Sequence, residues 1–279
     1  MTPGAFPLIA NNSPDLTTTH SAWYRITWRS HGSHLVWTAS SVLAGLVVWS
    51  LLAVADPVLV PSVGEVAGRI VDTTRSGALP RDVKASVLRV LMGFGLGSAA
   101  AVAVGLAIGL YSPVRRLAGP WIQFFRMIPP LALIPVAIVY LGIGEVAKVS
   151  VIALAVFLTV VIATIQGVAE ANPVLVRAAK VLGANERQMF LSVILPGAVP
   201  YILVGLRLGL AAGWTTVVAA ELIAASAGLG YLDEISGTFF DMTGAYVALI
   251  FIGIFGVLMD TVVTRMERWL TPWAERVTS

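Results

Sequence analysis

The chain has 279 residues, of which 57% are hydrophobic and only 12% charged, and its formal net charge is +3 at pH 7. This composition is typical of an integral membrane protein and leaves no room for a second sizeable soluble domain beside a helical bundle. The sequence contains no cysteine, which excludes a disulfide framework and a thiol metal site.

The first 33 residues are polar and rich in Pro, Asn and Thr, and we expect no cleavable signal peptide in them. We interpret residues 1–33 as an N-terminal cytoplasmic tail with an interfacial helix. Trp23, Arg25 and Trp28 belong to an aromatic and basic cluster just before the first apolar run, which is typical of a helix lying along the membrane surface. A frayed tail is the alternative.

Six apolar runs of about twenty residues or more follow, each long enough to cross a bilayer. They comprise residues 35–55, 90–110, 117–141, 149–169, 198–225 and 242–264. We therefore predict an all-α fold, a polytopic bundle of six transmembrane helices, as one domain at residues 34–279. Segment 172–196 would form a loop on its cytoplasmic side.

The second run is rich in glycine. Gly93, Gly97, Gly105 and Gly109 fall at spacings of four or eight residues, which place them on one face of a helix. Small residues on such a face let two helices approach closely in a membrane. We expect these glycines to pack against another helix, within one subunit or between two.

The third run carries an arginine near its middle. A charge inside a span is costly and indicates a functional role. Pro129 and Pro130 lack backbone donors, so the helix should break or kink where an aqueous path can line it. We assign Gln123, Arg126, Pro129 and Pro130 to a translocation path for an anion. The alternative is a buried structural ion pair between Arg126 and Glu221.

The fifth run supplies the other predicted path residues, Arg207, Trp214, Thr215 and Glu221. Trp214 and Glu221 are about two turns apart and therefore lie on the same helix face. Two alternatives stay open. Arg207 would bind carbonyl groups near the inner surface, and Glu221 would bind backbone groups of the segment 228–241.

Segment 172–196 is predicted to be a helix-turn-helix. Asn172 is a suitable N-cap, and Gly183 is the usual left-handed stop about ten residues later. Asn185 caps a second helix, with Gln188 at the capping-box position. Pro196 is predicted to end that helix, because proline lacks the donor needed to continue it.

The distribution of lysine and arginine favours an N-terminus on the inner side of the membrane. This orientation places segment 172–196 and both termini in the cytoplasm, and the helix expected at residues 62–75 outside. It leaves six basic residues outside, which are Arg69, Arg75, Arg81, Lys84, Arg89 and Lys148.

Three features of the segment follow one another at fixed spacings. Arg177 stands with Ala178 and Ala179, Gly183 follows after three residues, and residues 193–196 follow after nine more. This spacing resembles the signature loop of bacterial ABC-importer permeases, which reads Glu-Ala-Ala, three residues, Gly, nine residues, Ile, any residue, Leu-Pro. Arg177 stands where the family has Glu, and Val193 where it has Ile. An arginine there would alter the charge contact with the ATPase.

The likeness extends from about residue 57 to the C-terminus. The chain resembles the nitrate, sulfonate and taurine importer permeases, and within that group the taurine branch most. The segments that carry this likeness are 126–132, 142–145, 213–216, 220–225 and 270–273.

This resemblance implies a type I ABC importer fold in a bacterial plasma (inner) membrane, with a second copy of the chain, two ATP-binding subunits and an extracytoplasmic solute-binding protein as partners. ATP and Mg²⁺ would bind to the ATPase subunits. The chain itself has no Gly-x-x-x-x-Gly-Lys-Ser/Thr phosphate loop, so we expect it to hold no cofactor and to be no enzyme. The residues that would couple it to the ATPase are Arg177, Ala178, Ala179, Gly183, Ala184, Leu195 and Pro196.

The implied cargo is a small anion, with taurine or another sulfonate preferred over nitrate, bicarbonate or a small aromatic carboxylate. A membrane-embedded enzyme is disfavoured because the sequence has no catalytic motif of the common hydrolase or metalloprotease types. A passive anion channel is the alternative from a different class, since it would need no ATPase. Lipid would surround the spans, and we expect no nucleic-acid partner.

Overall fold

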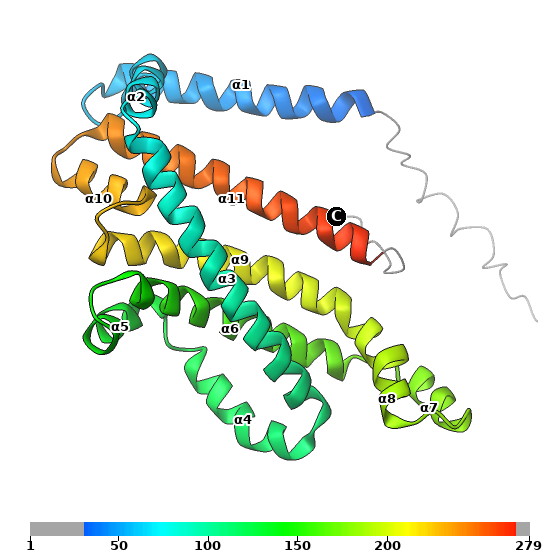
Figure 1. The fold of residues 1–279 in the computed structure, drawn as a ribbon. Helices are drawn as coiled ribbons and strands as arrows, with labels where there is room; N and C mark the ends of the chain where they lie inside the picture. Colours follow the sequence, from blue (N-terminus) through cyan, green and yellow to red (C-terminus); the bar gives the residue numbers. More distant parts are fainter. Residues whose placement is uncertain (1–30, 272–279) are drawn as a thin grey trace, which may run out of the picture. The chain divides into compact units, whose positions relative to one another are not determined.

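The computed structural model describes residues 31–271, which form helices and turns without a strand (Figure 1). This confirms the predicted all-α class. The first helix, α1 (His31–Ala55), contains an apolar stretch long enough to cross a membrane. The predicted interfacial cluster of Trp23, Arg25 and Trp28 lies outside the described residues, as does most of the tail.

Helix α2 (Val63–Arg75) occupies the segment where the sequence predicts a helix, and it begins with a capping box. The Ser62 hydroxyl accepts a hydrogen bond from the Glu65 N–H at 3.3 Å, and the Glu65 carboxylate accepts one from the Ser62 N–H at 2.8 Å. The backbone N–H and the hydroxyl of Ser62 stabilise the ionised carboxylate, which holds the pKa of Glu65 below its ordinary value.

Three long helices form the core: α3 (Ala78–Leu110), α6 (Glu145–Ala169) and α9 (Leu195–Ala224). The predicted glycine face of α3 packs against α6 within one chain. A Cβ atom at Gly93 would lie 2.5 Å from Ile152 Cγ2, and one at Gly105 would lie 2.6 Å from Thr164 Cβ. Neither distance leaves room for a side chain, so these glycines set how closely the two helices approach.

The third predicted span is not one continuous helix. It consists of α4 (Ser112–Phe125), a 3₁₀ turn η1 (Pro130–Leu133) and α5 (Ile134–Leu141), and the chain bends by 90° between its two halves. The break falls at residues 126–129. Pro129 is extended, with ψ of 129°, because a residue followed by proline is disfavoured in the helical region.

The helix-turn-helix of segment 172–196 is present as α7 (Pro173–Val181) and α8 (Glu186–Met189), but Pro196 does not end the second helix. Instead a π turn, η2 (Phe190–Ile194), joins α8 directly to α9. The Leu195 N–H donates to the carbonyl of Phe190, five residues back. This wider turn ends two residues before Pro196 and accommodates the proline, which would clash inside a regular α-helix. The prediction of a stop at Pro196 was therefore wrong.

The last two helices of the described residues are α10 (Leu229–Thr238) and α11 (Met242–Leu270), and both contact α9. Arg69 of α2 pairs with Asp241, whose carboxylate also accepts a hydrogen bond from the N–H of Gly244 at the start of α11. In the described part of the chain, five helices are long and apolar enough to span a membrane, and the bent pair raises this number to six. Figure 1 shows α7 and α8 at one end of α9 and α10 beside its other end.

Candidate functional site

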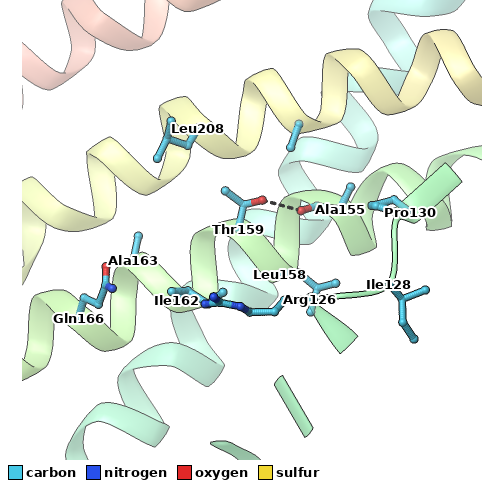
Figure 2. A pocket seen from close by; sticks show the side chains of 11 residues that line it. Arg126, Ile128, Pro130, Ala155, Leu158, Thr159, Ile162, Ala163, Gln166 and Leu208 are labelled. Carbon is cyan, nitrogen blue, oxygen red and sulfur yellow. Dashed lines mark hydrogen bonds between the residues drawn. The ribbon is translucent and has the colours of Figure 1, made fainter. Parts of the chain in front are cut away.

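The break in the third span places Arg126 at the edge of a cavity. Arg126 is the C-cap residue directly after α4, and its side chain is exposed. In Figure 2 it extends along α6 toward Ile162 and Gln166. The cavity has a volume of about 440 Å³. Its lining residues come from the break, α6 and α9, and they are Arg126, Ile128, Pro130, Ala155, Leu158, Thr159, Ile162, Ala163, Gln166, Leu208 and Ala212.

The cavity combines an apolar wall with few polar groups. Among the described residues, Arg126 is the one charged residue in its lining, and Thr159 and Gln166 of α6 add a hydroxyl and an amide. The Thr159 hydroxyl donates to the carbonyl of Ala155 at 3.0 Å, which leaves its lone pairs free to accept. One cation beside two neutral polar side chains suits a small anion that binds weakly and leaves again.

The sequence identified only part of this lining. Arg126 and Pro130 were predicted and are present there, and Pro129 lies in the break itself. Gln123 is exposed on α4 and is not part of the cavity wall. Thr159 and Gln166 were missed. Their spacing of seven residues puts both on one face of an otherwise apolar helix, and that spacing was the available signal.

Arg207 forms an ion pair with Asp260 across α9 and α11. Arg207 Nε lies 2.6 Å from Asp260 Oδ1, and Nη2 lies 2.9 Å from Oδ2, so the contact is bidentate. Both side chains are about half exposed, at 48% and 43%. The proposed alternative of carbonyl binding is thus replaced by a carboxylate partner.

Trp214 and Thr215 have different surroundings although they are adjacent. Trp214 is 8% exposed, and its indole N–H donates to the carbonyl of Ile252 on α11 at 2.9 Å. Thr215 is exposed, and its hydroxyl donates to the carbonyl of Ala212 on its own helix at 2.9 Å. Within one chain, Trp214 therefore connects α9 to α11, and Thr215 faces outward.

Glu221 is fully buried and pairs with Arg89 rather than Arg126. Arg89 Nη1 lies 2.6 Å from Glu221 Oε1. Glu221 also accepts from the N–H of Gly230 at 2.9 Å, which is the backbone contact that the alternative interpretation predicted. The second apolar run was predicted to begin at residue 90, whereas α3 begins at Ala78. Arg89 therefore lies within this helix, and its side chain is 6% exposed.

The sequence also missed the other partners of this buried cluster. Glu145, the first residue of α6, accepts from Arg89 at 2.6 and 2.7 Å and from Lys148 at 2.9 Å. The Ser86 hydroxyl lies 2.8 Å from both Glu221 oxygens. Lys148, which was expected on the outer side, is 5% exposed in the first turn of α6. These residues were overlooked because their contacts with Arg89 and Glu221 join segments distant in sequence, and no local sequence pattern reports such contacts.

The loop between α6 and α9 has its predicted caps. The Asn172 side chain accepts from the N–H of Val174 at 2.9 Å. Asn185 and Gln188 form a reciprocal capping box with both contacts at 2.9 Å. Gly183 has a left-handed φ of 78° between the two helices. These contacts fix the ends of both short helices.

The turn at Gly183 is a Schellman motif. The N–H of Ala184 donates to the carbonyl of Ala179, and the N–H of Gly183 donates to the carbonyl of Lys180, both at 3.0 Å. Ala179 and Ala184 are half-buried, while Arg177, Ala178 and Gly183 are exposed. Leu195 and Pro196 are half-buried at the start of α9.

Large apolar side chains project from this turn. Val181 and Leu182 are 88% and 86% exposed, and Val174 and Leu175 of α7 are also exposed. Exposing several large apolar side chains to water in one short loop is unfavourable, and such a cluster is typical of an interaction surface.

The comparisons with known proteins identify the class. Residues 93–276 match the family model described as the binding-protein-dependent transport system inner membrane component. The chain belongs to this family, and it is a multi-pass permease subunit of an ABC importer.

Two curated relatives illustrate the range. The chain is 48% identical to a probable ABC transporter permease protein of Brucella abortus over 236 residues, which is 85% of this chain and 94% of the relative. It is 35% identical to the taurine transport system permease protein of Escherichia coli over 258 residues, which is 89% of this chain and 94% of the relative.

The solved structures agree on the fold. The chain superposes on an inward-facing conformation of the MetNI methionine ABC transporter with a TM-score of 0.62 at 21% sequence identity. The match covers 71% of this chain and 98% of the other. This confirms the predicted fold of a type I importer permease.

Proposed function

We propose that the chain is the permease of an importer for a small anion, most specifically taurine or another sulfonate. The observation that carries this proposal is Arg126. Of the residues that the structure describes, it is the one charged side chain in a cavity that is otherwise apolar apart from Thr159 and Gln166. Guanidinium binds sulfonate and carboxylate oxygens through charge-assisted hydrogen bonds. The 35% identity to a taurine permease supports the sulfonate.

The exposed turn around Gly183 is the proposed docking site for an ATP-binding subunit. Its Schellman motif makes the turn rigid, and Val181 and Leu182 offer apolar surface to a cleft in the partner. The chain supplies no phosphate loop, so ATP and Mg²⁺ would be bound by that subunit. In this arrangement the turn lies in the cytoplasm, as do both termini.

The ion pair of Arg207 and Asp260 supports the proposal that two copies of the chain pack together around a shared path. Both residues lie within long apolar helices, and each side chain is about half exposed on the single chain. An arginine or aspartate at the centre of a span costs about 2.5–3.5 kcal/mol when it enters a membrane. We infer that this face of α9 and α11 contacts the second copy or the aqueous path, and not lipid.

A bicarbonate cargo is the second candidate, because the chain is 27% identical to the bicarbonate transport system permease protein of Synechococcus elongatus over 87% of its length. Both anions would use the same cation at Arg126. They differ in the external binding protein that delivers them.

Uptake of labelled taurine by cells with and without this chain tests the proposal. Unlabelled nitrate, bicarbonate, an alkanesulfonate and an aromatic carboxylate serve as competitors. Loss of uptake on deletion, competed only by the sulfonate, is the expected result. Unchanged taurine uptake on deletion would contradict the sulfonate, and uptake of an anion without an ATPase would favour a channel.

A further inference from the structure

The N-terminus of α10 is bound by side chains of α3 and α9. The N–H groups of Gly228, Leu229 and Gly230 donate in turn to Asp82 at 3.1 Å, to the Ser86 hydroxyl at 2.8 Å and to Glu221 at 2.9 Å. The first N–H groups of a helix have no partner within it, and carboxylates are favourable there. Three of these groups are satisfied by other helices, so α10 depends on them for its position.

Arg89 connects this anchored end to α6. Its guanidinium donates to the carbonyl of Ala227 at 2.6 Å, to Glu221 at 2.6 Å and to both oxygens of Glu145. One side chain thus joins α3, the start of α6, the end of α9 and the loop before α10. Removing it would leave Glu221 as a buried carboxylate without its cation, which is strongly unfavourable.

The loop fits this cluster without spare room. Gly228 has φ of 138°, and a Cβ atom there would collide with the Glu221 carboxyl group. A Cβ atom at Gly230 would lie 2.6 Å from the carbonyl oxygen of Val218. We therefore expect the loop before α10 to move together with the end of α9 as long as Arg89 and Glu221 stay paired.

The same helix reaches the Gly183 turn at its other end. The stretch Glu186–Ile223 is continuous over 38 residues, a length of roughly 57 Å at the usual rise of an α-helix. We propose that Arg89 is a positioning residue that makes α10 move with α9, so that a displacement at the Gly183 turn reaches the opposite end of the permease. This inference rests on the proposed docking of an ATPase at that turn.

Hydrogen exchange of the permease purified with its co-expressed ATPase tests the inference without a known substrate. Exchange is measured with and without ATP, Mg²⁺ and vanadate, in segments 172–196 and 225–238. In the unaltered protein we expect nucleotide to change exchange in both segments. In Arg89→Met the change at 172–196 persists, and the change at 225–238 is lost.

Three further variants separate positioning from stability. Arg89→Lys keeps a charge beside Glu221 and should recover part of the response, whereas Lys84→Met, an exposed residue on the same helix, should behave as the unaltered protein. If Arg89→Met fails to assemble, Glu145→Gln decides. Glu145 accepts from Nε and Nη2 of Arg89 and so fixes the direction of the guanidinium toward Glu221 and Ala227, while its side chain is 56% exposed and its neutralisation leaves Glu221 its cation. It should weaken the response at 225–238 with assembly unchanged.

Each outcome has one meaning. An undiminished response at 225–238 in an assembled Arg89→Met complex, or in Glu145→Gln when Arg89→Met does not assemble, overturns the inference and leaves the docking proposal intact. Absence of any nucleotide response at 172–196 in the unaltered complex refutes the docking proposal itself.

Discussion

Arg126, Arg207 and Arg89 are three arginines in apolar segments with three different environments. Arg89 is 6% exposed between two carboxylates, and Arg207 is half exposed and paired with Asp260. Arg126 lines a cavity with only neutral polar neighbours in its wall. Its charge is thus the one of the three that is best placed to meet an anion, while the other two are neutralised within the chain.

Replacing Arg126 with glutamine should reduce uptake of the transported anion by at least about tenfold, because hydrogen bonds to charged groups contribute about 1.5–3 kcal/mol and each 1.4 kcal/mol is a factor of ten. Initial uptake rates in cells measure this effect. Arg126→Lys keeps the charge and should retain more activity. Recovery of the ATPase with a tagged chain should be equal in both variants, and full uptake by Arg126→Gln would show that the cation is not used.

Gly183 is required by its backbone conformation and not by a lack of space. Nothing lies within 4 Å of a Cβ atom at this position, but φ is 78°. A left-handed residue with a side chain costs about 1–2 kcal/mol. Gly183→Val should therefore distort the turn and uncouple ATP hydrolysis from uptake, measured as transport per ATP hydrolysed.

Asparagine tolerates the left-handed region and serves as the matched control for this turn. Gly183→Asn should preserve most of the coupling. Equal ratios of transport to hydrolysis in Gly183→Val and the unaltered protein would refute a role for the turn geometry.

At the scale of elements, the contact between α3 and α6 depends on glycine, and two glycines of α3 in different surroundings allow this dependence to be tested. Gly105 faces Thr164, with 2.6 Å from its Cβ position to Thr164 Cβ, whereas Gly95 on the same helix has nothing within 4 Å. A substitution at Gly105 therefore reports on helix packing, whereas the same substitution at Gly95 reports on helix propensity alone.

We expect Gly105→Ala to lower the stability of the purified protein by about 1–3 kcal/mol through overpacking. Gly95→Ala should be neutral or stabilising by up to about 1 kcal/mol, because alanine is the better helix former. Thermal unfolding in detergent measures both. A similar shift in the two variants would mean that α3 and α6 do not depend on close approach at Gly105.

Helix caps and glycine spacings were predictable from the sequence because they depend on residues within a few positions. Asn172, Asn185 and the glycines of α3 are examples. The start of α3 and the continuation past Pro196 were not predictable. A hydropathy pattern locates only the apolar part of a helix, so it missed the polar first turns of α3. A π turn depends on the geometry of the whole helix, so the residues around Pro196 did not predict it.

The candidate site was predictable to a similar extent. Arg126 with its prolines could be found because a charge and a helix break coincide in an apolar run. The partner of Glu221 could not, since Arg89 precedes it by 132 residues and belongs to a different helix. Long-range pairing of buried charges depends on tertiary structure, which local patterns do not contain.

At the scale of the whole molecule, the sidedness of the chain decides whether the Gly183 turn can meet an ATPase. The predicted orientation puts α7 in the cytoplasm and α2 outside. Because the sequence has no cysteine, single substitutions can report each side without background. Val181 on α7 is 88% exposed, and Ser76 at the end of α2 is also exposed.

In intact cells, a maleimide that cannot cross the membrane should label Ser76→Cys at once and Val181→Cys only after permeabilisation. The physical reason is the excess of lysine and arginine on the α7 side, which membrane insertion retains in the cytoplasm. A permeable maleimide that labels both variants equally provides the control for reactivity. Labelling of Val181→Cys in intact cells would show that the chain has the opposite orientation, with the turn at Gly183 facing the binding protein instead of the ATPase.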